Sequence, residues 1–396
     1  MNTSDITTIA PTRVVVLGGG YAGAMAANRL RRKPDVDVTV VNPQPFFVHR
    51  IRLHQFVART GDPQVGFDAV LGDGIDVVVD TAVRIEAAAR RDHLASGKHL
   101  DYDHLIYAIG SRNRLPEIPG AADHALSASD WAAAQRLRAR LDTLDSGAPV
   151  GVVGGGLTGV ELAGEFADRG LAVTLAGGGV LAPSVGERGR RATLRQLARL
   201  GVDVLAEARV TRVQATQVTV EMDGHERVLP SAATVFATGF VAPELAADSG
   251  LTTDGIGRLR TDENLNSVDD ERIVGAGDAV AVAGIPLRMS CQAAQPLGVQ
   301  AAEAVLARIA GDSPKPVDQG FVAKCTSIGR HAATLQFTRR DDSPARAVVT
   351  GRLAALAKET VCRGIVWNIR REAARPGTFS WPRNREATAE REAVLQ

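Results

Sequence analysis

Two stretches of the chain share one pattern of hydrophobic and polar positions. Residues 13–30 (RVVVLGGGYAGAMAANRL) and 150–166 (VGVVGGGLTGVELAGEF) each begin with a short β-branched run, continue with GGGxxG and end in an alanine-rich stretch. A second apolar run follows each of them, VDVTVVN at 36–42 and LAVTLAG at 171–177. This succession predicts a strand, a helix and a second, parallel strand in each copy. The copies stand 136 residues apart, a spacing typical of duplicated domains rather than of a solenoid.

The glycines of the two turns have separate physical roles. Gly18 permits a tight turn at the strand end, Gly20 lets the backbone approach a pyrophosphate, and Gly23 lets the helix pack closely on the strand. The free N–H groups and the dipole at the helix start then favour phosphate, so we expect both turns to bind a dinucleotide. The candidate residues are Gly18, Gly20, Tyr21, Ala22 and Gly23 in the first copy and Gly154, Gly156, Leu157, Thr158 and Gly159 in the second.

The end of the second strand in such a unit usually meets the adenine-side ribose. The first unit has Asn42 there, which can hydrogen-bond a hydroxyl without charge assistance. The second unit has Ala176 and Gly177, so no carboxylate would repel a 2′-phosphate. Downstream arginines, on a helix expected over roughly 187–200, either meet such a phosphate or form a solvated helix face. The choice between NADH and NADPH therefore stays open.

Three further segments look like recurrent pieces of a flavoprotein, each a strand that ends in small residues. Residues 102–110 and 233–239 end in Gly110 and Gly239, and residues 273–278 end in Gly-Asp. Asp278 is either an ordinary turn residue or an acceptor for a ribityl hydroxyl. A helix expected from about 294 to 310 can point its positive N-terminus at the isoalloxazine edge of a flavin.

Taken together, these motifs resemble the two-dinucleotide-binding, FAD- and NAD(P)-dependent pyridine nucleotide oxidoreductases with the glutathione-reductase-like fold. Type II NADH:quinone dehydrogenases are the most similar group, because GGGLTGVELAGEF and TDENLNSVDDERIVGAGDAV are close to their second fingerprint and flavin-closing segment. The resemblance covers about residues 12–310. It implies FAD in the first unit and NADH or NADPH in the second. It also implies that Glu161 lies near the nicotinamide, and that Ala108, Gly110 and Asp278 line the FAD.

The fold class implied is α/β, with two Rossmann-like, three-layer ββα dinucleotide-binding domains of glutathione-reductase type. The FAD-binding domain is expected at 12–145 and 250–318, the NAD(P)H-binding domain at 146–249 and a small C-terminal region at 319–396. In the loop at 46–54, Arg50 and Arg52 either neutralise the FAD pyrophosphate or fix the flavin edge, or they are surface cations.

The resemblance implies an FAD-dependent NAD(P)H oxidoreductase. A hydride would pass from nicotinamide C4 to flavin N5, and the electrons would pass on to a quinone-like acceptor. Placement and electrostatics suffice for the hydride step, so no catalytic acid or base is assigned. Two alternatives stay open: a soluble flavoenzyme acting on a specialised metabolite or on oxygen, and a non-catalytic flavin- and nucleotide-binding redox sensor.

The sequence differs from related enzymes at positions that bear on which electron acceptor the flavin would reduce. Disulfide reductases carry a dithiol early in the FAD domain, whereas the first cysteine here is Cys291, which argues against disulfide reduction at the flavin. Sulfide:quinone reductases need paired cysteines, which Cys325 and Cys362 provide only if the fold brings them together. Quinone-reducing relatives commonly carry AQxAxQQ, and the matching residues 291–296 read CQAAQP, which keeps one Gln and one Ala.

Composition and charge exclude other classes of protein. Forty-six basic and 45 acidic residues give a net charge of +1, and aromatic residues are only 4%, so no nucleic-acid partner is expected. His49 and His54 have no second ligand pair beside them, so no metal site is expected. The chain starts without a signal-peptide pattern, and no apolar run approaches the roughly 20 residues of a membrane span. With three cysteines and no CxxC, we expect a cytoplasmic protein.

The C-terminal part of the chain changes in character. Residues 339–385 contain eleven Arg or Lys and four Asp or Glu, and apolar residues recur among them at near-helical spacing. This basic amphipathic helix with a Trp either packs on protein or lies on the cytoplasmic face of a membrane, as in quinone-reducing relatives. The resemblance also leaves a homodimer open.

Overall fold

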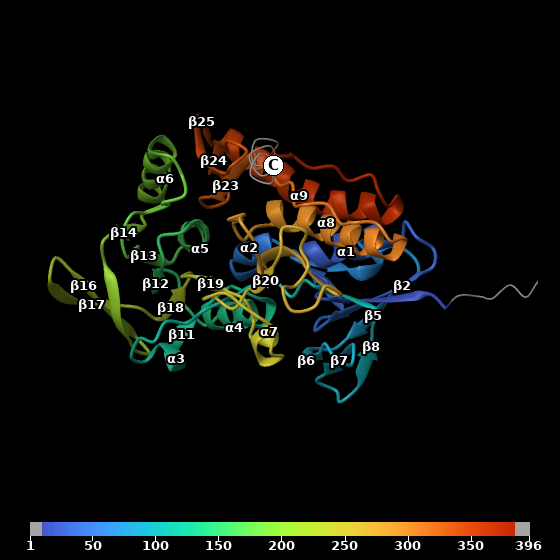
Figure 1. The fold of residues 1–396 in the computed structure, drawn as a ribbon. Helices are drawn as coiled ribbons and strands as arrows, with labels where there is room; N and C mark the ends of the chain where they lie inside the picture. The colour runs from blue at the N-terminus through green and yellow to red at the C-terminus, as the bar shows by residue number, and fades with distance from the viewer. Residues whose placement is uncertain (1–9, 385–396) are drawn as a thin grey trace, which may run out of the picture.

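The computed structural model describes residues 10–384, and a parallel sheet organises the first nucleotide unit. Its five strands lie in the order β21 (Ile273–Gly275), β9 (His104–Tyr107), β1 (Thr12–Leu17), β2 (Val36–Asn42) and β5 (Ile75–Val79). Helices α1 (Tyr21–Leu30) and α8 (Cys291–Ala310) cover one face. An antiparallel sheet lies below the other face (Figure 1), with strands β6 (Ala82–Glu86), β7 (Arg91–Leu94) and β8 (His99–Asp101).

The second unit repeats this plan. Its parallel sheet has the order β11 (Ala125–Leu126), β18 (Ala233–Phe236), β12 (Pro149–Val153), β13 (Ala172–Ala176) and β14 (Asp203–Leu205). Its antiparallel sheet consists of β15 (Arg209–Val213), β16 (Gln217–Met222) and β17 (His225–Pro230). The helices around it are α4 (Trp131–Leu141), α5 (Leu157–Asp168) and α6 (Glu187–Arg199). The duplicated α/β fold predicted from the two glycine turns is therefore confirmed.

Short elements connect these layers. Near the first sheet they are β3 (Phe46–Val48), η1 (Arg50–Arg52), α2 (Leu53–Val57), β4 (Gln64–Gly66) and η2 (Phe67–Ala69). Between and after the units they are β10 (Arg112–Asn113), α3 (Ala121–His124), β19 (Phe240–Val241), α7 (Leu245–Asp248), β20 (Leu259–Thr261), η3 (Gly277–Ala279) and β22 (Val280–Val282). The helix α2 packs on α4 and α5, which brings the first unit against the second.

Helix α8 begins earlier than the sequence pattern indicates. It starts at Cys291, where the hydroxyl of Ser290 accepts a hydrogen bond from the N–H of Ala293. Pro296 therefore lies inside the helix and cannot donate to the carbonyl oxygen of Gln292. The side-chain amide of Gln319 donates to that carbonyl instead, at 3.3 Å. A proline is tolerated here because a partner from another segment replaces the lost hydrogen bond.

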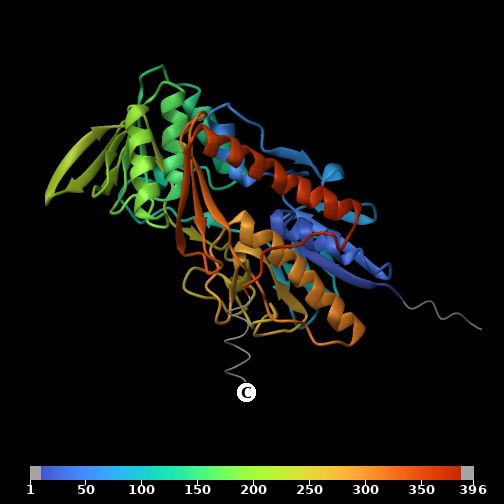
Figure 2. The same ribbon diagram turned by 90° about the horizontal axis from the view of Figure 1, so that it is seen from above.

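The C-terminal region lies against both nucleotide units. Its strands β23 (Ala323–Ser327), β24 (Ala333–Thr338) and β25 (Pro344–Gly351) form an antiparallel sheet that contacts α5 and α6. The sheet leads into α9 (Arg352–Ala374), the predicted basic amphipathic helix, which lies along α1 (Figures 1 and 2). No helix within residues 10–384 is long and apolar enough to cross a bilayer. Residues 385–396 of the expected C-terminal region lie outside the described residues.

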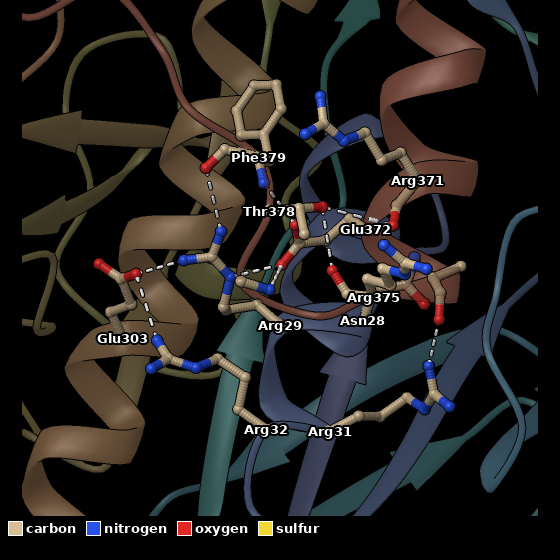
Figure 3. Close-up of polar contacts among 12 residues, drawn as sticks. Asn28, Arg29, Arg31, Arg32, Glu303, Arg371, Glu372, Arg375, Thr378 and Phe379 are labelled. Carbon is tan, nitrogen blue, oxygen red and sulfur yellow. Dashed lines mark hydrogen bonds and ion pairs between the residues drawn. The ribbon is translucent and has the colours of Figure 1, made fainter.

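A buried ion pair fastens α9 to α1, as Figure 3 shows. Arg29 at the end of α1 donates to Glu372, whose side chain is fully buried, and to Glu303 on α8. The Glu372 carboxylate also accepts hydrogen bonds from the backbone N–H groups of Gly377 and Phe379, at 2.7 and 2.8 Å. One carboxylate thus fixes both the end of α9 and the turn that follows it.

Candidate functional site

The first glycine turn has the geometry that its sequence predicts. Gly18 has φ +97°, and a Cβ at Gly18 would collide with the carbonyl oxygen of Ala108. A Cβ at Gly23 would overlap the carbonyl oxygen of Gly18, so the helix approaches the turn too closely for any side chain. A Cβ at Gly20 would meet nothing within 4 Å. The open side of the turn is therefore the N-terminus of α1, where backbone N–H groups favour an anion.

The second turn repeats this geometry residue by residue. Gly154 has φ +127° and lies against the carbonyl of Ala237, and a Cβ at Gly159 would overlap the carbonyl oxygen of Gly154. Gly156, the N-cap of α5, faces open space. Leu157 and Thr158 follow it on the first turn of α5.

Asn42 lies at the end of β2, and its side chain supports the first turn. Its Oδ1 accepts a hydrogen bond from the N–H of Gly19 at 2.9 Å, and its amide donates to the carbonyl of Gln44 at 2.8 Å. Both contacts hold the glycine turn beside β2. The expected contact of Asn42 with a ribose hydroxyl stays a prediction.

Of the other predicted residues, two are buried alanines and two are glycines with positive φ at strand ends. Ala22 is buried against Gly298 of α8, and Ala108 is buried behind Gly18. Gly110 and Gly239 both have positive φ, +73° and +54°, at the ends of the two corresponding strands. Ala108, Gly110 and Gly239 therefore shape the strand ends on which a cofactor would lie, while Ala22 packs α1 on α8.

A polar cluster gathers where β9 and β21 end. Asp278 accepts a hydrogen bond from the hydroxyl of Ser111 at 2.9 Å. The Arg50 guanidinium lies 4.0 Å from the Asp278 carboxylate and donates to the carbonyl of Ser129 at 2.8 Å. Arg52, in contrast, points to α9 and pairs with Glu359 at 2.8 Å. The sequence offered both arginines for the flavin, and the fold brings only Arg50 to Asp278.

A central cavity of about 740 Å³ lies between the two units. That volume falls within the roughly 300–1,000 Å³ typical of small-molecule sites. Its walls come from α1, α2, α5, α8, β23, β24 and α9. The predicted residues that line it are Tyr21, Arg50, Leu157, Thr158, Glu161 and Asp278. The fold thus brings residues that follow both glycine turns to one cavity that opens to the surface.

Glu161 forms the polar centre of one cavity wall. Lys358 of α9 donates to Glu161 Oε1, which also accepts the N–H of Ser327 at 3.1 Å. Oε2 lies 3.7 Å from Nδ1 of His54 on α2. Burial lowers the pKa of Lys358 to about 8, so the ammonium is a stronger acid than an exposed lysine. Burial, with the charges of Lys358 and other cations, holds the pKa of His54 well below its usual value.

The side chain of Tyr21 is fixed by contacts with the loop that follows β3. Its hydroxyl contacts Nδ1 of His49 at 2.8 Å and accepts the N–H of Ile51 at 3.2 Å. Nε2 of His49 contacts the carbonyl oxygen of Cys362 on α9 at 3.1 Å. Burial, followed by the charge of Arg52, lowers the pKa of His49 to about 4, so the ring is neutral. Neutral His49 therefore donates from Nε2 to Cys362 and accepts from the Tyr21 hydroxyl.

All three cysteines line the central cavity. Cys291 begins α8, Cys325 lies in β23 and Cys362 in α9. The fold thus brings Cys325 and Cys362 to one cavity, although no disulfide joins any of the three. Burial raises the pKa of Cys291 and of Cys325 to about 12, and it also raises that of Cys362. The thiols are therefore protonated at neutral pH, unlike the thiolates that attack disulfides.

Lys358 and His54 are residues that reasoning from the sequence does not find. Lys358 lies 197 residues beyond Glu161, on the helix that the sequence predicts only as a basic amphipathic helix. One signal for Lys358 was present, because it lies four residues after Ala354 and four before Cys362, on the apolar face of the helix. His54 was considered only as a metal ligand.

Comparison with known proteins identifies the family of the chain. Residues 12–301 match the pyridine nucleotide-disulphide oxidoreductase family. The chain belongs to this family. An NADH dehydrogenase-like protein of Mycobacterium tuberculosis is 32% identical over 317 residues, covering 72% of this chain and 78% of the relative. A type II NADH:quinone oxidoreductase of Staphylococcus aureus is 25% identical over 399 residues, covering 90% and 96%.

Solved structures agree on the fold of this pyridine nucleotide-disulphide oxidoreductase. NDH2 of Plasmodium falciparum superposes with a TM-score of 0.79 at 15% identity, covering 94% of this chain and 99% of that one. Sulfide:quinone oxidoreductase of Aquifex aeolicus gives 0.77 at 20% identity, covering 92% and 93%. The chain is thus an enzyme, an oxidoreductase of a family that uses a flavin and NAD(P)H in general.

Proposed function

We propose that this chain is an FAD-dependent NAD(P)H oxidoreductase that reduces a quinone-like acceptor. The observation that carries the proposal is the central cavity, in which residues of both glycine turns meet a buried lysine–glutamate pair. The relatives named NADH dehydrogenase-like and NADH:quinone oxidoreductase support the same activity.

The first unit fits FAD. The turn from Gly18 to Gly23 leaves its phosphate side open, because a Cβ at Gly20 would meet nothing. Asp278, fixed by Ser111, offers carboxylate oxygens to hydroxyl groups, and Arg50 beside it offers a positive charge. When bound, FAD supplies the two-electron chemistry between a nicotinamide and an acceptor.

The second unit fits the nicotinamide nucleotide. The open N-terminus of α5 at Gly156 suits a pyrophosphate, and Glu161 lies one turn further along the same helix at the cavity. The carboxyl end of β13 carries no carboxylate, and both NADH and NADPH remain donors to test.

The remaining wall of the cavity fits an apolar acceptor. Four exposed side chains, Phe240, Val322, Phe337 and Val361, belong both to its lining and to the protein surface. Reduction of a quinone to a hydroquinone consumes protons, and Lys358, with its pKa of about 8, holds a proton at the cavity at neutral pH. The backbone N–H of Ser327 donates to the Glu161 carboxylate, and this carboxylate in turn orients the Lys358 ammonium.

The outer face of α9 fits a membrane surface. Leu353, Leu356 and Trp367 are 71%, 67% and 57% exposed, and α9 and the residues after it carry unburied arginines beside them. Apolar and basic side chains on one helix favour an anionic lipid interface. We propose peripheral contact through this face. A cytoplasmic location and a homodimer stay predictions.

Steady-state oxidation of NADH and of NADPH with a panel of soluble quinones tests the proposal. We expect turnover with at least one donor and one quinone. We also expect the rate to fall as the pH rises through about 8, because Lys358 then loses its proton. Lys358→Met should retain FAD and lose that alkaline limb. If the protein oxidises neither NADH nor NADPH with any quinone, the proposal is contradicted. If it oxidises a donor but passes the electrons only to oxygen, the assignment of a quinone acceptor is refuted.

A further inference from the structure

Three consecutive glycines, Gly177–Gly179, follow β13 and form a loop, here called the glycine loop, that is tied to the turn after β14. Their N–H groups donate, in chain order, to the carbonyl oxygens of Leu205, Ala208 and Ala206, at 2.9, 3.1 and 2.7 Å. A Cβ at Gly177 would lie 2.6 Å from the carbonyl oxygen of Ala206. No side chain, and therefore no carboxylate, fits at the first residue after β13.

The glycine loop lies directly against the second glycine turn. The N–H of Gly155 donates to the carbonyl oxygen of Gly177 at 3.2 Å, and the N–H of Ala182 donates to the carbonyl oxygen of Gly155 at 2.6 Å. The open N-terminus of α5 at Gly156 suits a pyrophosphate. In a unit of this kind, the adenine-side ribose of the same dinucleotide lies at the end of the second strand. The glycine loop therefore stands where the 2′ position of that ribose would lie.

Little charge is fixed around the glycine loop. Residues 170–186 contain no Asp, Glu, Lys, Arg or His. The helix α6 then begins with Glu187 and Arg188, both exposed, and Arg191 pairs with Glu187 at 3.4 Å. In the turn after β14, Glu207 is exposed to solvent, where salt screens its charge. Because the three N–H groups of the loop are already bonded, the loop offers a 2′-phosphate neither a repelling carboxylate nor a free donor.

We propose that the second unit accepts NADH and NADPH with comparable efficiency, because the glycine loop leaves the 2′ position of the ribose without a selecting charge. The inference rests on the proposed function and names its donor class. Units of this type that select NADH carry an acidic residue at this strand end. Gly178 is the position at which one can be added, since it is exposed, has φ +69° and has room for a Cβ. Asp and Asn tolerate this backbone conformation better than most side chains.

The test compares nucleotides that differ only in the 2′-phosphate. Titration calorimetry gives dissociation constants for NAD⁺ and NADP⁺, and anaerobic mixing gives the rate constants of flavin reduction by NADH and NADPH. Gly178→Asp adds a carboxylate to the glycine loop, and Gly178→Asn adds a side chain of the same size without charge. Gly224→Asp is the matched control, because Gly224 has φ +76° and room for a Cβ in the turn between β16 and β17. Glu207→Gln tests the exposed carboxylate of the neighbouring turn.

We expect the wild-type ratio between the two nucleotides, in dissociation constant and in rate constant, to lie within about tenfold of unity. Gly178→Asp should weaken NADP⁺ relative to NAD⁺ by about tenfold or more, because the new carboxylate meets a like-charged phosphate. Gly178→Asn, Gly224→Asp and Glu207→Gln should keep the wild-type ratio. Taking the ratio within each variant removes effects common to both nucleotides, and FAD content and circular dichroism establish that each variant is folded.

A wild-type ratio outside that range overturns the inference and leaves the proposed function intact. An unchanged ratio in a folded Gly178→Asp variant also overturns it, because the glycine loop would then not face the 2′ position. A ratio that shifts beyond the same range in Glu207→Gln overturns it as well, since a charge outside the loop would then select the donor. Protein that binds neither nucleotide, and whose flavin neither donor reduces, refutes the proposed function together with the inference.

Discussion

Asp92, a single buried carboxyl, lies far from the cavity and makes stability depend on pH. It lies in β7 with 0% exposure, and neither carboxylate oxygen has a partner within the described residues. Burial, helped by the negative charge of Asp80, raises the pKa of Asp92 to about 7. Because the folded state then binds a proton that the unfolded state has lost above about pH 4, stability falls as the pH rises from about 4 to about 7.

Asp92→Asn should remove this dependence. We expect the variant to gain stability over the wild type at pH 8 relative to pH 5, by up to about 3 kcal/mol, since Asn carries no charge to bury. Urea unfolding at the two pH values measures the difference. Equal pH dependence in the two proteins would show that Asp92 is ionised in the folded state.

Two glycines of one turn should respond differently to the same methyl group. Gly156→Ala adds a Cβ that meets nothing, so we expect unchanged stability and FAD content, with the KM for NAD(P)H raised about tenfold or more. Gly159→Ala places its Cβ on the carbonyl of Gly154 and should destabilise the fold itself. Thermal unfolding and donor titration separate the two effects. Gly156→Ala with unchanged donor KM would contradict a pyrophosphate at this turn.

At the scale of the element, α9 has two faces with different tasks. Its buried face carries Lys358, Cys362 and Ile369 to the cavity and to α1, while Leu356 and Trp367 point outward. Replacing both outward residues with Glu should reduce sedimentation with anionic vesicles by at least about tenfold, because each buried side chain contributes roughly 1.5–3 kcal/mol. Activity with a soluble quinone should stay within about twofold.

The matched control for that experiment is Val228→Glu, on the exposed strand β17 of the second unit. It removes an apolar side chain of similar exposure and should leave vesicle binding unchanged. Wild-type protein that fails to sediment with anionic vesicles at low salt would contradict membrane contact through α9.

The elements that sequence patterns predicted are those defined by local backbone chemistry. The two glycine turns follow from residues such as Gly18 and Gly154, whose positive φ only glycine adopts readily. The start of α8 was misplaced because the partner that makes Pro296 tolerable, Gln319, comes from a distant segment. Lys358 was missed for the same reason, since its pairing with Glu161 depends on how the C-terminal region docks.

At the scale of the whole molecule, the C-terminal region fixes the arrangement of the cavity. Its sheet contacts α5 and α6, and the side chains of Arg29 and Glu372 join α9 to α1 (Figure 3). Arg29→Met should destabilise the protein by about 3–5 kcal/mol, because Glu372 would stay buried without its counter-charge. Arg29→Met combined with Glu372→Met should cost less than the single substitution. Urea unfolding measures both, and a loss below about 1 kcal/mol in Arg29→Met would contradict this role.

The central claim is that two nucleotide sites open on one cavity, so that a nicotinamide can reach the flavin. Anaerobic mixing of the FAD-loaded protein with NADH or with NADPH tests it most directly. The account predicts that at least one of the two donors reduces the flavin, so that the absorbance band of oxidised FAD disappears after mixing. Absorbance that stays unchanged with both donors, in protein that retains FAD, would contradict it.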